Sequence, residues 1–206
     1  MKRRHFFLLS LFSIVRPAVS FAGQPSHNLE SLRRKLEAVS SFSCTFRQTK
    51  TLLGQNFSLV STGTLEVQKG HLLIWNQKTP FVQTFRIVDG TATISIEGGK
   101  EEKLNPQNNE IFNLFIAAVK NIIEGSFDSL GQYFEVSLNG NESAWLARLT
   151  PLNGHSVFGK AFKEIVVKGS KFINYIEFVE RNSDCTNIYF SNISANQHGR
   201  KSASLS

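Results

Sequence analysis

The side chains that could perform acid–base or nucleophilic chemistry do not form a catalytic pattern. Glu101 and Glu102 are adjacent on an expected strand, so they would point to opposite faces instead of working as a pair. The sequence contains no G-x-S-x-G, no H-E-x-x-H, no paired-cysteine zinc spacing and no phosphate-binding glycine loop. The histidines after residue 22 stand singly in expected turns or termini, where a solvated imidazole is the ordinary state: His27, His71, His155 and His198. We therefore expect no enzyme, no metal site and no cofactor.

Aromatic side chains are what this sequence has in abundance, with 18 phenylalanines and two tryptophans. Ordinary core packing is one interpretation, because aromatic residues contribute large burial energies wherever they sit. The other interpretation is the lining of an apolar ligand cavity. For that lining we select one group of residues: Phe42, Phe46, Leu73, Trp75, Phe85, Trp145, Phe162 and Phe178.

The first 22 residues have the pattern of a signal peptide. A basic start, Met1 to His5, precedes an apolar run from Phe6 to Val15 that is too short to span a bilayer, and small residues flank Phe21. We predict cleavage after residue 22, with an uncleaved anchor as the alternative. The remainder is expected to form one domain over residues 23–195 and a flexible tail over residues 196–206.

The basic character of the chain lies largely in that leader. It holds four of the 23 lysines and arginines and none of the acidic residues, so its removal lowers the formal net charge from +7 to +3. A small, scattered positive excess argues against a nucleic-acid partner. The densest basic cluster, Arg33 to Lys35, shares an expected helix with Glu30 and Glu37. It is read as a solvated helix face, with an anionic-lipid or acidic docking patch as the alternative.

Cys44 and Cys185 are the two cysteines of the chain. In an oxidising compartment they could form a disulfide if the first and last strands brought them together. Otherwise they would be two small buried apolar side chains. The sequence leaves both interpretations open.

Two helices and ten or eleven strands account for the rest of the pattern. An amphipathic helix over residues 28–39 precedes the strands, and residues 109–124 form a helix that is apolar on most of its circumference. This second helix either packs wholly inside or acts as a lid over a cavity through Ile111, Phe112, Phe115, Ile116 and Val119. Short connections favour antiparallel neighbours. We predict a mainly β fold of the α+β class, a strongly curved antiparallel sheet that forms an unclosed barrel with a helical lid.

Residues 63–80 are the stretch around which the other strands are arranged. Leu65 and Val67 alternate with polar neighbours, Lys69-Gly70 makes the turn, and Pro80 ends the second strand because it lacks a ladder donor. Further short motifs precede and follow this hairpin in a definite order: F-x-Q at Phe46 to Gln48, G-x-L at Gly63 to Leu65, Trp75, Pro80, Asp89-Gly90 and W-x-x-x-L-x-P at Trp145 to Pro151. In this order the chain resembles the periplasmic lipoprotein carriers of the LolA family, in particular a shorter carrier-like branch of it.

The resemblance implies a periplasmic chaperone that shields the acyl chains of lipoproteins or other lipidated cargo and moves them from the inner to the outer membrane. It implies three partners, namely the acylated lipoprotein or lipid cargo, an ATP-driven loading complex in the inner membrane, and an outer-membrane acceptor. We expect a monomer. Two rival interpretations stay open: a lipid-sensing regulatory module of the cell envelope that uses the same half-barrel, and a structural secreted barrel with a filled interior.

One departure from the family lies at the hairpin turn, where Arg-Pro is replaced by Lys69-Gly70. In the family that arginine is said to latch the closed lid by hydrogen bonds to helix carbonyls. Lys69 is therefore the candidate latch residue. Its ammonium is a flexible point charge with three donors, whereas a guanidinium offers five in a fixed plane.

Overall fold

One antiparallel sheet of eleven strands makes up most of the protein. A computed structural model describes residues 27–104, 110–141, 143–154 and 156–197, so the expected signal peptide and the end of the expected tail lie outside the described residues. The strand order is β6-β5-β4-β3-β2-β1-β11-β10-β9-β8-β7. The mainly β, antiparallel fold class is therefore confirmed.

The strands in chain order are β1 (Val39–Thr51), β2 (Ser58–Gln68), β3 (Leu72–Thr79), β4 (Gln83–Val88), β5 (Thr91–Ile96), β6 (Glu102–Lys103), β7 (Phe134–Asn141), β8 (Ala144–Pro151), β9 (Phe162–Gly169), β10 (Ile173–Glu180) and β11 (Cys185–Gln197). The helices are α1 (His27–Glu37), α2 (Glu110–Ile123), α3 (Phe127–Gly131) and α4 (Val157–Ala161).

The sheet consists of two meanders that meet at one seam. Strands β1 to β6 pair with their chain neighbours, as do β7 to β11, and the antiparallel pairing of β1 with β11 joins the two sets. In this seam Phe46 lies opposite Phe190, and Thr51 lies opposite Cys185. Strands β6 and β7 are the two ends of the sheet, which is therefore open.

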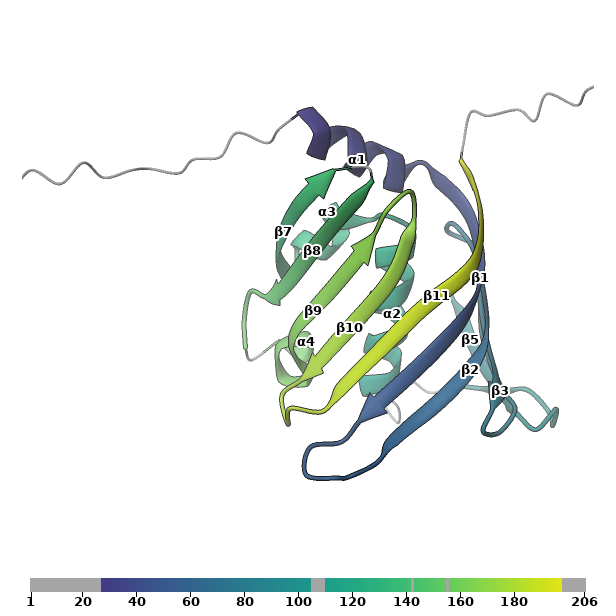
Figure 1. Ribbon diagram of the computed structural model, residues 1–206. Helices are drawn as coiled ribbons and strands as arrows, with labels where there is room; N and C mark the ends of the chain where they lie inside the picture. Colours follow the sequence, from purple (N-terminus) through teal and green to yellow (C-terminus); the bar gives the residue numbers. More distant parts are fainter. Residues whose placement is uncertain (1–26, 105–109, 142, 155, 198–206) are drawn as a thin grey trace, which may run out of the picture.

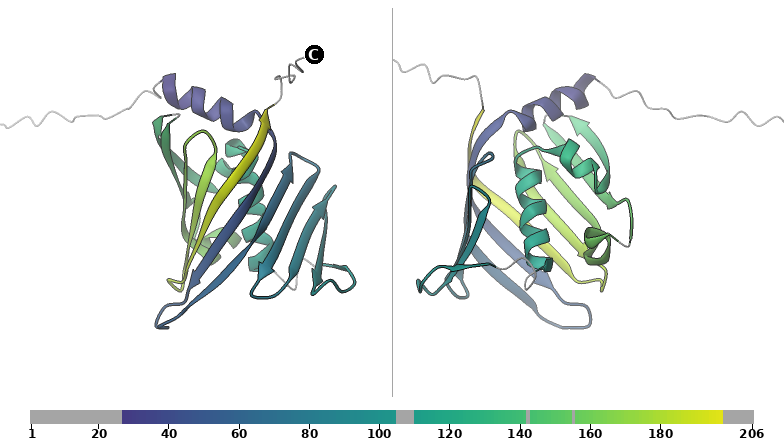
Figure 2. Two further views of the ribbon diagram at one scale, coloured as in Figure 1. Left: turned by 45° about the vertical axis from the view of Figure 1, so that its right-hand side comes forward. Right: turned by 180° about the vertical axis from the view of Figure 1, so that it is seen from behind.

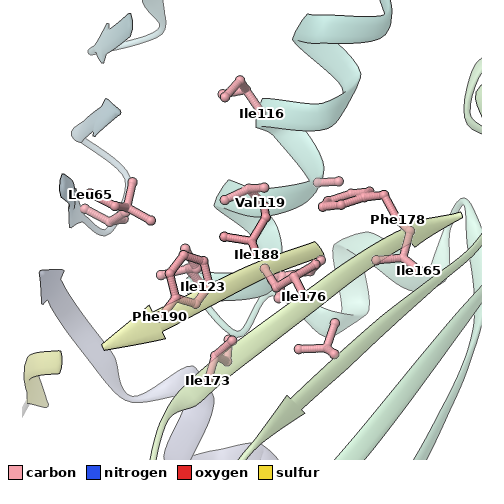
Figure 3. Close-up of a cluster of buried hydrophobic side chains, with 14 of the residues drawn as sticks. Leu65, Ile116, Val119, Ile123, Ile165, Ile173, Ile176, Phe178, Ile188 and Phe190 are labelled. Atoms are coloured by element: carbon pink, nitrogen blue, oxygen red, sulfur yellow. The ribbon is translucent and has the colours of Figure 1, made fainter. Parts of the chain in front are cut away.

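The two halves of the sheet are inclined to each other, and α2 lies in the hollow between them, while α1 crosses one end (Figure 1 and Figure 2). Side chains of α2 and of both halves share one buried cluster. Figure 3 shows Val119 and Ile123 of α2 among side chains of the sheet that include Ile176 of β10 and Ile188 of β11. From Ile116 onward, the apolar character of α2 is thus explained by burial against the sheet.

Several element boundaries differ from the sequence-based expectation, and one helix was not expected. β1 begins at Val39, two residues earlier than expected, because α1 already ends at Glu37. β11 runs to Gln197, past the expected domain end at residue 195, since Asn196 still pairs with Ser41. The short helix α4 was not expected, and its Ser156 cap accepts a hydrogen bond from the Gly159 backbone.

The ends of α1 and α2 approach each other closely at Gly125. This residue has a φ of 65°, and an added Cβ would lie within 3 Å of the backbone of Leu36 and Glu37. Only glycine adopts this conformation freely and leaves room for the neighbouring backbone. Gly125 therefore allows the turn after α2 to rest on α1.

Candidate functional site

A cavity of about 370 Å³ opens at one end of the sheet. This end, here named the mouth end, is where β1, β3 and β10 finish and where β2, β4 and β11 begin, as the strand registers require. The lining residues come from β1, β3, β4, β9, β10 and β11: Gln48, Lys50, Trp75, Gln77, Gln83, Phe85, Phe162, Phe178, Glu180 and Thr186.

Four aromatic side chains form the apolar wall of the cavity: Trp75, Phe85, Phe162 and Phe178. All four are buried in the protein, and the rings of Phe162 and Phe178 lie 5.4 Å apart. These residues were selected from the sequence as cavity lining, and the structure brings them together from four strands. The wall can bind an apolar chain without a large rearrangement of side chains.

The other four residues selected from the sequence lie next to this cavity or beyond it. Phe46 supports the wall from behind, since its ring is 4.1 Å from that of Trp75. Phe42 packs edge-on against Phe190, and Leu73 is fully buried. Trp145 lies toward the opposite end of the sheet, where its indole nitrogen donates to the Ser170 carbonyl at 2.7 Å.

The F-x-Q and G-x-L motifs have a common physical reason. Phe46 and Gly63 face each other across β1 and β2, and a Cβ on Gly63 would meet both the Phe46 ring and the carbonyl oxygen of Asn76. The glycine thus lets the Phe46 ring lie flat over the neighbouring strand and reach Trp75. Gln48 then follows on the same inward face and reaches the cavity.

Six polar residues of the lining were missed by the sequence analysis: Gln48, Lys50, Gln77, Gln83, Glu180 and Thr186. A signal for them was present. The period of two that places Phe42 and Phe46 inward continues to Gln48 and Lys50, so the inner face of β1 turns from apolar to polar toward the mouth end.

Lys50 and Glu180 form an ion pair across the cavity, with 2.8 Å between Nζ and Oε1. Their side chains are 34% and 17% exposed, so the pair is partly shielded from water. Lys50 and Glu180 are the only charged residues in the described cavity lining. The lining as a whole therefore carries no net charge.

The predicted lid is α2, which contributes side chains to the buried cluster, but only part of the helix is described at the level of side chains. Ile116 and Val119 are buried in the hollow of the sheet. The side chains of Ile111, Phe112 and Phe115 lie outside the described residues. The lid role of α2 accordingly remains a prediction.

The β2–β3 turn holds the ends of α1 and α2 together. The Lys69 ammonium donates to the backbone oxygens of Glu37, at 2.6 Å, and Glu124, at 2.9 Å. The last carbonyls of a helix lack intrahelical partners and carry the negative end of the helix dipole, so a cation is favoured there. Lys69 thus contacts two helix ends at once.

Glu124 completes this junction from the other side. Its carboxylate is buried and accepts hydrogen bonds from the Gly70 backbone N–H, at 3.1 Å, and from the Lys120 ammonium, at 2.8 Å. The Gly70 contact needs a backbone donor that a proline at that position would lack. The β2–β3 turn is therefore held to the helix ends by the Lys69 side chain and by the Gly70 backbone N–H.

The two cysteines do not form the disulfide that we considered. Both are free thiols, Cys44 buried and Cys185 half-buried. The register places Cys185 opposite Thr51, seven residues along β1 from Cys44. At about 3.3 Å per residue the two lie more than 20 Å apart along the strand, far beyond disulfide reach.

Exposed apolar side chains are concentrated around the mouth end. They stand on the β1–β2 and β3–β4 connections, at the end of β5, and beside α4: Leu53, Phe57, Leu59, Phe81, Val82, Ile96, Leu152 and Val157. Such a concentration on one end is unusual for a surface that faces only water. The opening of the cavity is thus bordered by apolar surface.

Searches for other kinds of site gave no candidates among the described residues. Over these ranges, His, Cys, Asp and Glu form no group of three or more that could bind a metal ion. In the same part of the chain, no helix has the length and apolar character needed to cross a bilayer.

Comparison with known proteins identifies the family. The sequence profile described as "Outer membrane lipoprotein carrier protein LolA" matches residues 37–203. The chain belongs to the LolA family. Members of this family are periplasmic carriers of lipoproteins and not enzymes, so a lipoprotein-carrier-like role follows for this LolA-family protein. The resemblance inferred from the order of short motifs is confirmed.

Solved structures that resemble the protein are distant. They include a LolA superfamily protein from Nitrosomonas europaea, with 8% identity, a TM-score of 0.45, and coverage of 82% of this chain and 93% of the other. The complex of MucA and MucB from Pseudomonas aeruginosa has 13% identity and a TM-score of 0.40, and the match covers 84% of this chain and 57% of the other. A DUF1329 family protein from Desulfovibrio piger has 9% identity and a TM-score of 0.44, and the match covers 84% of this chain and 95% of the other. No curated protein matches the chain.

Proposed function

We propose that this LolA-family protein is a periplasmic chaperone that shields an acyl chain of lipidated cargo in the cavity and carries it from the inner to the outer membrane. The observation that carries the proposal is the aromatic-walled cavity that opens at the mouth end. Its volume of about 370 Å³ lies in the lower part of the range found for ligand sites. Further room arises when α2, acting as the lid, moves away from the sheet.

The free energy of burying an acyl chain determines which partners such a carrier needs. Each buried methylene contributes about 0.8 kcal/mol, so a sixteen-carbon chain is worth about 12 kcal/mol relative to water. A bilayer offers the same amount, and extraction from it gives almost no net gain. We therefore propose loading by an ATP-driven inner-membrane complex and release to an outer-membrane acceptor. A cleaved signal peptide over residues 1–22 brings the chain to the periplasm, where it acts as a monomer.

Native mass spectrometry with organic extraction tests this proposal. The protein is purified from a periplasmic extract, and we expect a mass above that of the chain together with an acylated lipid or lipopeptide in the extract. Thr186→Phe adds a ring inside the cavity and should lower the bound fraction severalfold. Thr51→Phe makes the same change on an exposed residue of β1 and serves as the control.

A wild-type mass equal to that of the empty chain, unchanged after incubation with a lipidated peptide, would overturn the proposal and favour a filled structural barrel. Transfer to acceptor vesicles separates the remaining alternative. A protein that binds lipid but never delivers it to vesicles bearing the acceptor would be a lipid sensor and not a carrier.

A further inference from the structure

The inner faces of five strands change from apolar to polar toward the mouth end. On β1, Phe46 is followed by Gln48, and on β3, Trp75 is followed by Gln77. The same change occurs on the other three strands, from Phe85 to Gln83, from Phe178 to Glu180 and from Ile188 to Thr186. The six polar lining residues named above form what we call the polar band. On each of these five strands the polar residue lies nearer the mouth end than the apolar residue.

The charges of the polar band compensate each other. Lys50 and Glu180 are paired at 2.8 Å, and the remaining members are three glutamines and one threonine. A ligand that carries a net charge would have to compete with one member of the pair and would leave the other partly buried without a partner, which is costly. The band is therefore matched to an uncharged group.

The glutamine amides supply hydrogen-bonding groups of both kinds. Each amide has a carbonyl acceptor and two N–H donors. Within the described residues, the side chains of Gln48 and Gln83 have no protein hydrogen-bond partner, and Gln77 donates to the Phe81 carbonyl at 3.2 Å. A hydrocarbon placed against these amides would displace their water without replacing its hydrogen bonds. A group with both N–H and C=O would replace them.

We infer that the polar band is a subsite for an uncharged head group bearing amide N–H and C=O, joined to an acyl chain that lies on the aromatic wall. This inference rests on the proposed function, because it assigns the polar part of the same cargo. It adds a selectivity. The protein prefers an acylated amide or peptide to a free fatty acid, whose carboxylate meets the negative charge of Glu180.

The test compares two ligands with the same chain, palmitate and N-palmitoylglycinamide, by displacement of a fluorescent acyl probe at pH 8. Glu180→Gln removes the negative charge and leaves the Lys50 ammonium facing the cavity. The double variant Lys50→Met with Glu180→Gln restores a neutral band. Glu164→Gln is the matched control, because it breaks an ion pair with Arg148 that does not line the cavity. Each substitution keeps the approximate size of the side chain, so the variants should fold.

We expect the wild type to prefer the amide by about tenfold or more, and Glu180→Gln to shift the ratio of the two affinities toward palmitate by at least about tenfold. The double variant and Glu164→Gln should return ratios close to that of the wild type. An unchanged ratio in Glu180→Gln, with both ligands bound, would overturn the head-group inference and leave the carrier proposal standing. Failure of the wild type to bind either ligand would overturn both.

Discussion

Cys44 illustrates at the scale of one residue how burial sets reactivity. Its side chain lies in the core, and this burial raises the pKa of the thiol from 9.0 to about 12. For Cys185 burial and a hydrogen bond to Glu177 raise the pKa to about 11. A thiol that keeps its proton is a poor nucleophile, so both cysteines are expected to be inert in the folded protein.

The first prediction concerns these thiols. At pH 8 an aromatic disulfide reagent should modify Cys185 slowly and Cys44 at least about a hundredfold more slowly than in urea. Between pH 9 and 12 the unfolded chain loses the Cys44 proton while the folded chain keeps it, so stability should fall as the pH rises through this window. Cys44→Ala should remove that part of the loss. Equal reaction rates with and without urea would contradict the burial argument.

The polar band shows why the candidate site was only half predictable at this scale. The four aromatic wall residues could be found because aromatic side chains in strands with apolar–polar alternation indicate the interior face: Trp75, Phe85, Phe162 and Phe178. Gln48 and Lys50 lie on the same inward face as Phe46, but polar residues near a strand end are ordinarily solvated. Whether they face a cavity depends on how strands that are distant in the sequence pack together. The pattern of one strand carries no information on that packing.

At the scale of elements, the β2–β3 turn and the ends of α1 and α2 act as one unit. Lys69 contacts the Glu37 and Glu124 carbonyls, and the Glu124 carboxylate accepts from Gly70. Lysine offers three flexible donors where the arginine of the family offers five in a fixed plane. The structure gives its ammonium two carbonyl contacts and gives the turn an additional backbone contact. Release of α2 would require these hydrogen bonds to break together.

The second prediction tests this junction. Lys69→Met keeps the apolar stem and removes the ammonium, so we expect a loss of about 2 kcal/mol in stability, because two hydrogen bonds to a charged group are lost. Amide exchange over the second half of α2 should become faster. Lys78→Met, at an exposed position of β3, is the control. If both variants exchange alike, Lys69 does not hold α2.

Most elements could be predicted because their patterns are local. Alternation located the strands, and the Asp89-Gly90 turn lies between β4 and β5 as expected. The short helix α4 could not be found, since five residues hold little more than one turn of periodicity. The extension of β11 to Gln197 was also missed, because its exposed end carries no apolar alternation and is defined only by pairing with β1.

At the scale of the whole molecule, the strands differ in how firmly they are held. β1 is paired along its length on both sides, with β2 and β11, whereas β6 is a two-residue strand at the end of the sheet. Exposed edges with few hydrogen bonds open locally at low cost. Opening of the protein should therefore begin at β6 and leave the seam intact.

The third prediction follows from this difference. Hydrogen–deuterium exchange should show the slowest exchange in peptides from β1 and β11 and the fastest among the strands in β6. Addition of N-palmitoylglycinamide should slow exchange at the cavity strands β3, β4 and β10 and leave β6 unchanged. Exchange in β1 as fast as that in β6 would contradict the assigned role of the seam.

The seam has a consequence for how the chain acquires its fold. Ser40 and Asn196 are 156 residues apart, and they contact each other where β1 meets β11. A chain made from its amino terminus can form the hairpins of β1 to β6 early, yet one edge of β1 stays unpaired until β11 has been made. During that interval the edge can accept β11 of a second copy, which would give an exchanged dimer. Refolding at low protein concentration should therefore favour pairing of β1 with β11 of the same chain.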